Sequence, residues 1–169
     1  RIRKNRPMKP FAVMFKNFTQ LNDFAKVSIA EKKIIISKEK PITLVKRRKL
    51  NKLSRFVTPK IEKLGVFLPY TPLHCILFKY LNNPIIATSA NLSDEPIIIN
   101  KEELISKLSN VVENVLDFNR DIINACDDSV VQVVNDKNFM LRQSRGYAPK
   151  TLKLPFKTDK KILAIGANQ

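Results

Sequence analysis

Short apolar runs, each only a few residues long, are the feature that most restricts what this chain can fold into. Four of them are bounded by proline, glycine or charged residues and are typical of buried strands: 10–15, 41–47, 65–69 and 84–88. Segments with helical spacing lie between them, at 17–26, at 28–33 and after Thr71-Pro72, which is an N-cap followed by proline. Strands that alternate with helices predict an α/β arrangement.

The last third of the chain departs from this alternation. Asn100, with Glu103 three residues later, predicts the start of another helix. A strand is expected at 115–118, and a hairpin is expected from 129–134 and 139–142. We therefore predict an α/β or α+β fold with one twisted sheet, mixed parallel and antiparallel, and flanking helices.

The length of 169 residues suits one domain with a core of its own. Because the chain starts at Arg1 and not at methionine, we expect a fragment of a longer protein. The segment 150–161 has the composition of a linker, and a new apolar strand begins after it. We expect one domain over 1–155, a linker over 156–161 and the start of a following domain over 162–169.

No apolar run approaches the roughly 20 residues that a membrane span requires, and the basic N-terminus lacks the apolar region of a signal peptide. The two cysteines, Cys75 and Cys126, form neither a CxxC pair nor a disulfide framework, and no metal-ligating cluster surrounds either one. These features predict a cytoplasmic protein with no membrane partner.

The net charge of +16 permits a nucleic-acid partner. Only one dense cationic run is present, from Lys46 to Lys52, and no aromatic residues are interleaved with it to stack bases. A solvated basic surface or an anionic small ligand is therefore favoured over a nucleic acid.

Two pairs of polar residues are candidates for anion binding. Lys4 and Arg6 are two positions apart, so their side chains would point the same way from an extended segment. Thr88, Ser89 and Asn91 follow an expected strand, where α/β folds place ligands, and they offer hydroxyl and amide donors. A ragged basic end and an ordinary polar turn remain the competing explanations.

Further candidates lie near the C-terminal hairpin. Asp127 and Asp128 are weak candidates for Mg²⁺ ligands, and Arg142 and Arg145 could hold a phosphate or pair with nearby acids. His74 is the single histidine, and a structural role is favoured for it. The chain has no Walker A motif, no GxGxxG motif and no hydrolase triad.

Five blocks of sequence carry a resemblance to a known family. In chain order they are RKNRPMKPFAVM, GVFLPYTPLHCILF, IIATSANLSDEPI, FNRDIINACDDSVV and RQSRGYAP. Together they resemble the YrdC-like domain of hydrogenase maturation carbamoyltransferases of the HypF type. Lys4-x-Arg6 and Ser89-x-Asn91 are similar to the Lys-x-Arg…Ser-x-Asn signature of YrdC-like domains. The resemblance covers residues 1–155 and implies a YrdC-like fold, and ILAIGAN resembles the opening of the domain that follows.

The resemblance implies an adenylating enzyme. Carbamate, made from carbamoyl phosphate by an upstream acylphosphatase domain, would react with ATP to give carbamoyl adenylate and pyrophosphate. The following domain would pass the carbamoyl group to a cysteine of a HypE-type partner, for the cyanide ligands of a [NiFe] hydrogenase. ATP with Mg²⁺ is expected, and zinc only in the region before Arg1. No covalent nucleophile is implied in this domain, and nucleotide or acyl-adenylate binding is assigned to Lys4, Arg6, Thr88, Ser89, Asn91 and, more weakly, Arg142 and Arg145.

The chain departs from the family pattern at several positions. Phe118 stands where relatives commonly have histidine, TSAN replaces the common TSGN, and Asp94 replaces a common glycine. The family's upstream domains lie before Arg1, so whether the fragment is active alone stays open. Two alternatives also stay open: a threonylcarbamoyl-AMP synthase of tRNA modification, which shares the fold and the four signature residues, and a basic RNA-binding module. PYTPLH, RGYAP and ILAIGAN favour the carbamoyl enzyme.

Overall fold

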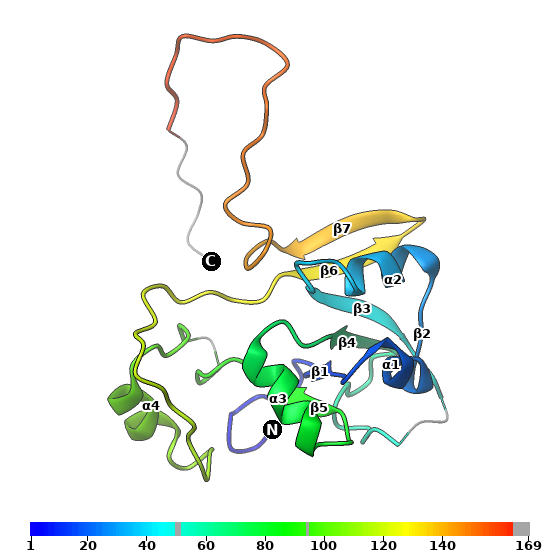
Figure 1. Cartoon of the computed structure of the whole chain (residues 1–169), viewed down its shortest axis with the longest axis vertical. Helices are drawn as coiled ribbons and strands as arrows, with labels where there is room; N and C mark the ends of the chain where they lie inside the picture. The colour runs from blue at the N-terminus through cyan, green and yellow to red at the C-terminus, as the bar shows by residue number, and fades with distance from the viewer. Residues whose placement is uncertain (50–51, 94, 164–169) are drawn as a thin grey trace.

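A computed structural model describes residues 1–49, 52–93 and 95–163. Its strands form one sheet in the order β5-β1-β4-β3-β6-β7, and β2 pairs with β3 (Figure 1). The strands are β1 (Ala12–Met14), β2 (Ala25–Lys26), β3 (Ile42–Arg47), β4 (Lys63–Phe67), β5 (Ile85–Ala87), β6 (Val130–Val134) and β7 (Lys137–Arg142). The helices are α1 (Phe18–Phe24), α2 (Ile29–Ile35), α3 (Pro72–Tyr80) and α4 (Lys101–Leu108).

The sheet is mixed, which confirms the predicted fold class. β1 pairs with β4 and β3 with β6 in parallel, whereas the other pairs are antiparallel. The predicted hairpin joins β6 to β7 through Asn135 and Asp136, both at positive φ. Asparagine and aspartate tolerate this conformation, which a two-residue hairpin of type I′ requires.

Local capping explains where the helices begin. The side chain of Thr71 accepts a hydrogen bond from the backbone N–H of His74, and Pro72 occupies the first turn of α3. Asn100 caps α4 in the same way through the N–H of Glu103. Both predicted helix starts are confirmed.

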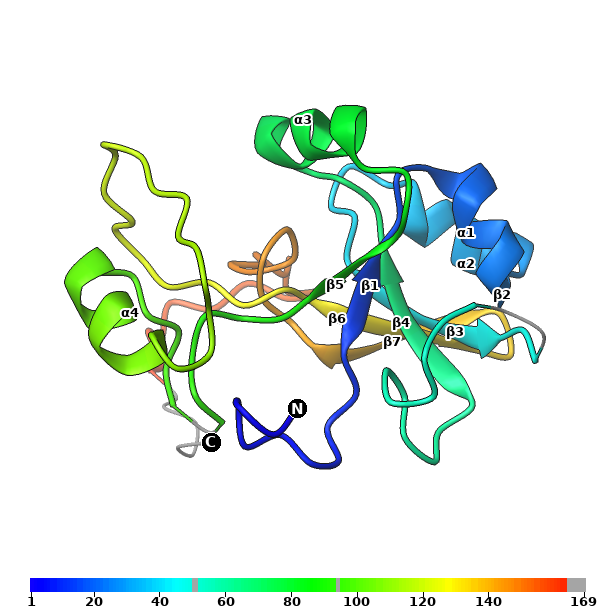
Figure 2. The same ribbon diagram turned by 90° about the horizontal axis from the view of Figure 1, so that it is seen from below.

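The two faces of the sheet have different neighbours because strand side chains alternate. One face carries Val13, Val45, Leu64 and Val66 into a core with Leu21 of α1 and Ile35 of α2. Figure 2 shows α1 and α2 together beside the strands. The alternate residues of the same strands point to the other face, where they line a cavity.

Several expected elements differ in the structure. Residues 115–118 form no strand, and Val115, Leu116 and Phe118 are exposed in a long irregular segment. The helix α4 and this segment lie apart from the sheet (Figures 1 and 2), so no neighbouring strand supplies backbone partners for 115–118. The helix-spaced segment expected at 17–26 ends as a helix at Phe24, and its last two residues form the short strand β2, which was not predicted.

The helical spacing after Thr71-Pro72 and after Asn100 also predicts apolar stripes, which include Tyr80 in α3 and Ile105 in α4, and neither of these side chains is buried. In α3 the buried residue is Phe78, whereas Tyr80 is 82% exposed. In α4 only Leu108 is buried, and Ile105 is half exposed. Both helices touch the rest of the domain on a narrow face, so few of their apolar positions are covered.

Residues 150–163 have no helix or strand and extend away from the sheet (Figure 1). The linker expected at 156–161 falls in this segment, and most of the strand expected within 162–169 lies outside the described residues. Asp94 also lies outside them. Within the described ranges, no helix is long and apolar enough to cross a membrane.

Candidate functional site

A cavity of about 800 Å³ lies on the sheet face that α1 and α2 leave uncovered. Its floor is formed by alternate residues of the central strands: Ala12, Met14, Ile42, Leu44, Gly65, Phe67, Val130 and Gln132. Ala87, Ala12 and Gly65 are paired side by side across β5, β1 and β4. Because these are the smallest side chains, the floor is lowest here and leaves room for a ligand.

Lys4 is held behind one wall of the cavity. It is only 8% exposed, and its Nζ donates to the Thr88 hydroxyl at 3.0 Å and to the Ser89 carbonyl at 2.6 Å. Burial, with a smaller effect from Arg6, lowers the pKa of Lys4. The expectation of an extended Lys4–Arg6 segment is wrong, because residues 2–5 form a turn with Asn5 at positive φ. The Lys4 side chain therefore reaches Thr88 and Ser89, whereas the Arg6 side chain lines the cavity.

Arg6 lines the cavity directly. Its Nε and Nη2 donate to the carbonyls of Lys9 and Pro10, and its guanidinium lies 5.3 Å from the centre of the Phe11 ring. Burial, followed by the charges of Arg1 and Arg142, lowers the pKa of Arg6. The charges of Arg1 and Arg142 thus act on Arg6, and a bound anion would stabilise this arrangement of like charges.

The segment after β5 forms a compact polar turn. The Ser89 hydroxyl donates to the side-chain carbonyl of Asn91 at 2.7 Å, and the Asn91 amide donates to the Glu95 carbonyl at 2.8 Å. Ser89 and Thr88 line the cavity, whereas Asn91 lies behind them. The predicted residues are thus brought together, with Asn91 positioning Ser89.

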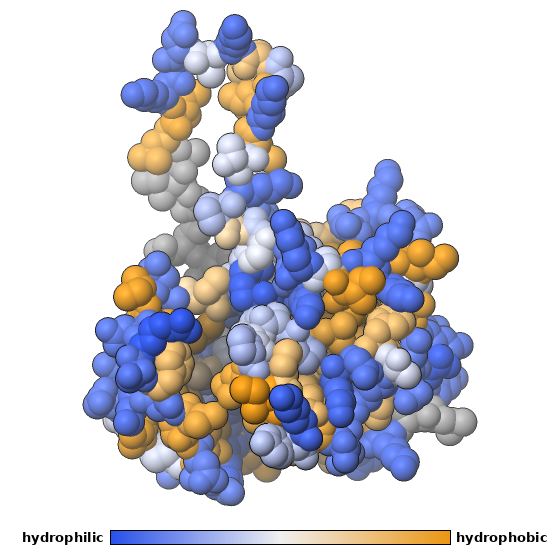
Figure 3. Space-filling view, in the orientation of Figure 1, coloured by the Kyte–Doolittle hydropathy of each residue, from blue (hydrophilic) through white to orange (hydrophobic). Residues whose placement is uncertain are grey.

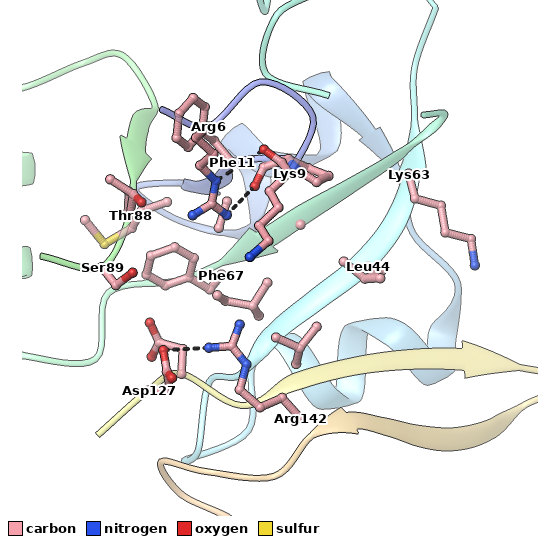
Figure 4. Close-up of a pocket in the computed structure, with 18 of the residues that line it drawn as sticks. Arg6, Lys9, Phe11, Leu44, Lys63, Phe67, Thr88, Ser89, Asp127 and Arg142 are labelled. Carbon is pink, nitrogen blue, oxygen red and sulfur yellow. Dashed lines mark hydrogen bonds and ion pairs between the residues drawn. The ribbon is translucent and has the colours of Figure 1, made fainter. Parts of the chain in front are cut away.

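Arg142 and Asp127 form an ion pair of 2.6 Å at the opposite side of the cavity from Arg6 (Figure 4). Both side chains are about half exposed. They meet because β7 ends where β6 begins, with Val130 paired to Arg142. Arg142 can therefore exchange the carboxylate for a ligand phosphate without unpacking the core.

Arg145 occupies a different environment. Its Nε donates to Asp128 at 2.8 Å, its two Nη groups donate to the carbonyls of Glu39 and Lys40, and its guanidinium stacks 3.5 Å from the centre of the Tyr70 ring. Arg145 is not among the residues that line the cavity. The geometry gives Arg145 a role in joining the hairpin to the rest of the sheet.

Asp127 and Asp128 are each paired with an arginine. Within the described ranges, no group of three or more His, Cys, Asp or Glu side chains could hold a metal ion.

Sequence reasoning did not single out Tyr70 or Gly65, although both line the cavity. For Gly65 a signal was present, since a glycine inside an apolar strand often marks a close approach of another group. Phe118, the position at which the family resemblance leads us to expect histidine, is exposed, with Arg120 at 5.3 Å from its ring centre. It is not among the residues lining the cavity.

Comparison with protein families matches residues 1–144 to the Sua5/YciO/YrdC model, described as telomere recombination. The carbamoyltransferase HypF of Synechocystis is 40% identical over 168 residues, which are 99% of this chain and 22% of that protein. The chain thus spans about a fifth of the length of the curated relatives it matches.

Comparison with solved structures also finds similarity to a HypF protein. Full-length HypF, in a phosphate- and nucleotide-bound form, superimposes with a TM-score of 0.85 at 39% identity, over 89% of this chain and 24% of that one. Sua5 of P. abyssi, complexed with L-threonine, gives a TM-score of 0.71 at 20% identity, over 85% of this chain and 42% of that one. The second similarity shows a shared fold alone.

Proposed function

Because this chain belongs to the Sua5/YciO/YrdC family, we propose that its cavity binds ATP and carbamate and forms carbamoyl adenylate. The observation that carries the proposal is the convergence of Arg6, Ser89 and Arg142 on one cavity whose floor is apolar. The similarity to HypF carbamoyltransferases over 99% of the chain supports carbamoyl as the acyl group.

The reaction needs no covalent intermediate with the protein. A carboxylate oxygen of carbamate forms a bond to the α-phosphorus of ATP, and the bond from that phosphorus to the bridging oxygen of the β-phosphate breaks. The electron pair leaves with pyrophosphate, so negative charge grows on the departing group. Cations and hydroxyl donors fixed around the phosphates stabilise that charge, and the cavity holds the two reactants in line.

The residues divide into two roles. Arg6, Thr88, Ser89 and Arg142 line the cavity and would contact the phosphates or the acyl adenylate. Lys4 and Asn91 lie behind the Thr88–Ser89 turn and hold it by hydrogen bonds. Lys4 would also add a buried positive charge behind the turn that we propose contacts the phosphates.

Mg²⁺ would enter with ATP as part of the substrate. It binds one or two carboxylates and completes its shell with phosphate oxygens and water. Asp127 and Asp128 would have to leave their arginines to take part, so we propose that the nucleotide supplies most of the ligands.

In a longer polypeptide the proposed product has an onward path. By the resemblance to HypF proteins, carbamate would come from carbamoyl phosphate, and a following domain would deliver the carbamoyl group to a HypE-type partner. The final use would be the cyanide ligands of a [NiFe] hydrogenase.

The test is the acyl substrate on which pyrophosphate release depends. The chain is incubated with MgATP and either ammonium carbamate or L-threonine with bicarbonate, and pyrophosphate is measured. We expect release with carbamate that threonine does not increase. Release that requires threonine would instead identify a threonylcarbamoyl-AMP synthase.

One surface feature favours a second candidate, a nucleic-acid-binding module. Lys26, Lys46 and Lys63 lie directly opposite one another across β2, β3 and β4, on the same sheet face as the cavity. Like charges in this register destabilise a sheet, and no ion pair among the described residues involves these three. On the face seen in Figure 3, hydrophilic residues are spread among apolar ones.

Because Lys63 also lines the cavity, a double substitution of Lys26 and Lys46 by glutamine is the variant that separates the two functions. RNA binding would weaken and lose part of its salt dependence, whereas carbamate-dependent pyrophosphate release would be unchanged. Loss of pyrophosphate release in this variant would place the lysines in the ATP site.

A further inference from the structure

His74 is a cavity-lining residue that the proposed reaction does not use. It lies in the first turn of α3, where its backbone N–H is capped by Thr71. Its imidazole meets the Tyr70 ring edge to face, with ring centres 4.8 Å apart and planes at 88°. Tyr70 is in turn covered by the guanidinium of Arg145. The orientation of the imidazole is therefore fixed by packing.

The two ring nitrogens of His74 have different surroundings. Nδ1 is shielded from solvent and has no hydrogen-bond partner among the described residues. Nε2 is not among the shielded, unpaired atoms and makes no described hydrogen bond within the chain. Since His74 lines the cavity, Nε2 is the nitrogen left to face it.

This difference determines where the proton resides. A buried N–H without an acceptor is costlier than a buried lone pair without a donor. The neutral imidazole therefore carries its proton on Nε2 and presents an N–H to the cavity. Burial lowers the pKa of His74, Arg145 lowers it further and Asp128 opposes them, so the ring is neutral near pH 7.

The groups beside His74 indicate what kind of ligand this end of the cavity accepts. Asp127 and Asp128 line the same cavity. The charge of Asp128 acts on His74 and disfavours a phosphate beside it, and a carboxylate oxygen is an acceptor for an NH₂ group. A neutral N–H donor beside carboxylate acceptors matches a planar group that has an acceptor atom next to an amino group.

We propose that His74 is a neutral hydrogen-bond donor that recognises such a planar edge of the bound acyl adenylate. The inference rests on the proposed function, because that ligand supplies two edges of this chemistry. One is the carbamoyl group, with its carbonyl oxygen and NH₂. The other is the adenine ring, with N1 beside the 6-amino group.

Two variants isolate the donor. His74→Gln keeps an amide N–H near the position of Nε2, whereas His74→Met has a similar length and no donor. Thermal unfolding of both variants checks that the α3 packing against Tyr70 is retained. A role in packing alone would not distinguish ligands that differ only at the recognised edge.

Two pairs of ligands, measured by isothermal titration calorimetry, distinguish the sources. The first pair is 5′-O-(N-carbamoylsulfamoyl)adenosine and 5′-O-sulfamoyladenosine, which differ by the carbamoyl group. The second pair is AMP and IMP, because N1 is an acceptor in AMP and a protonated donor in IMP. If His74 contacts the carbamoyl edge, the wild-type chain should bind the carbamoylated compound more tightly than 5′-O-sulfamoyladenosine. If His74 contacts the adenine edge, the wild-type chain should bind AMP more tightly than IMP.

For the preferred ligand of that pair, His74→Met should lose about tenfold in affinity, and for the other ligand it should lose little. The affinity of His74→Gln for the preferred ligand should stay within about threefold of the wild type. Equal losses for all four ligands, no loss, or a glutamine variant as weak as the methionine variant would each overturn the inference. A wild type that gains nothing from the carbamoyl group contradicts the proposed function instead, and AMP against IMP then still decides the role of His74.

Discussion

The ammonium group of Lys4 donates a hydrogen bond of 3.0 Å to the hydroxyl of Thr88, across 84 positions of the chain. A second bond joins it to the Ser89 carbonyl, and the Ser93 hydroxyl donates back to the carbonyls of Lys4 and Asn5. The N-terminal turn and the segment after β5 are therefore one unit. A buried charge in such a unit costs stability. We therefore expect the charge of Lys4 to serve ligand binding and not folding.

Replacing this lysine should separate stability from binding. Lys4→Met removes a costly buried charge but leaves two acceptors unpaired, so the free energy of unfolding should change by no more than about 1 kcal/mol. ATP affinity should fall by at least about tenfold, because the Thr88–Ser89 turn loses its anchor and the site loses a charge. Urea unfolding and calorimetric titration measure the two effects, with Lys38→Met, at a side chain 92% exposed, as the control.

The lowered pKa of Lys4 gives this comparison a pH dependence. The folded chain releases the Lys4 proton more easily than the unfolded chain, whose lysine keeps the ordinary value near 10.5. The unfolded state then binds more protons just below that value, so stability rises with pH there. The wild type should gain stability relative to Lys4→Met as pH approaches about 10.5 from below. A difference independent of pH would contradict the shift.

Asp127 should restrain Arg142 rather than hold Mg²⁺. Asp127→Asn removes the charge that pairs with Arg142 at 2.6 Å, so the guanidinium is freed for a phosphate and affinity for MgATP should stay equal or rise by up to a few fold. Arg142→Ala should weaken binding by about tenfold and change stability by less than about 1 kcal/mol, since the pair is half exposed.

Titrations with and without Mg²⁺ distinguish the roles of Asp127. A loss of MgATP affinity in Asp127→Asn, with affinity for metal-free ATP unchanged, would make the carboxylate a metal ligand.

Arg145 should matter for folding more than Arg142 does. Arg145→Ala leaves the Glu39 and Lys40 carbonyls and the Asp128 carboxylate without their donor and uncovers Tyr70. We expect a loss of about 2–4 kcal/mol in the free energy of unfolding. Arg145→Lys should recover only part of it, because an ammonium cannot reproduce the planar fork. Full stability in the alanine variant, measured by urea unfolding, would rule out this role.

Gly65 should set the depth of the cavity floor. A Cβ at this position would meet the Ile42 side chain at 3.1 Å, so Gly65→Ala should cost less than about 1 kcal/mol after a small shift. Gly65→Leu should extend into the cavity and weaken ATP binding by at least about tenfold. If the leucine variant is folded and binds ATP as the wild type does, the nucleotide does not lie over this part of the sheet.

Local signals made much of the fold predictable. Strands at β1, β3, β4 and β5 followed from short apolar runs, and Thr71, Asn100 and the Asn135–Asp136 turn are determined by side-chain and backbone chemistry within a few residues. The strand expected at 115–118 was wrong because a strand needs a neighbour, and apolar composition says nothing about where one lies. Which faces of α3 and α4 are covered depends in the same way on which elements lie next to each helix, and the helical spacing does not contain that information.

The candidate site was predictable in membership but not in geometry. The spacing of Lys4 and Arg6 suggested one direction for both side chains, yet the turn at Asn5 sends Lys4 behind the Thr88–Ser89 segment. Arg142 and Arg145 looked equivalent in sequence. Their difference comes from strand register, which places Arg142 opposite Val130 and lets Arg145 reach Glu39 and Lys40, more than 100 positions away in the chain.

If Arg6 and Ser89 face ATP in this cavity, as proposed, replacing either side chain should lower the affinity for ATP. Arg6→Ala and Ser89→Ala should each weaken ATP binding by at least about tenfold in calorimetric titrations, with unfolding close to that of the wild type. Arg55→Ala, at an exposed residue that does not line the cavity, is the matched control and should bind as the wild type does. Unchanged ATP affinity in both cavity variants would show that ATP does not bind against Arg6 and Ser89.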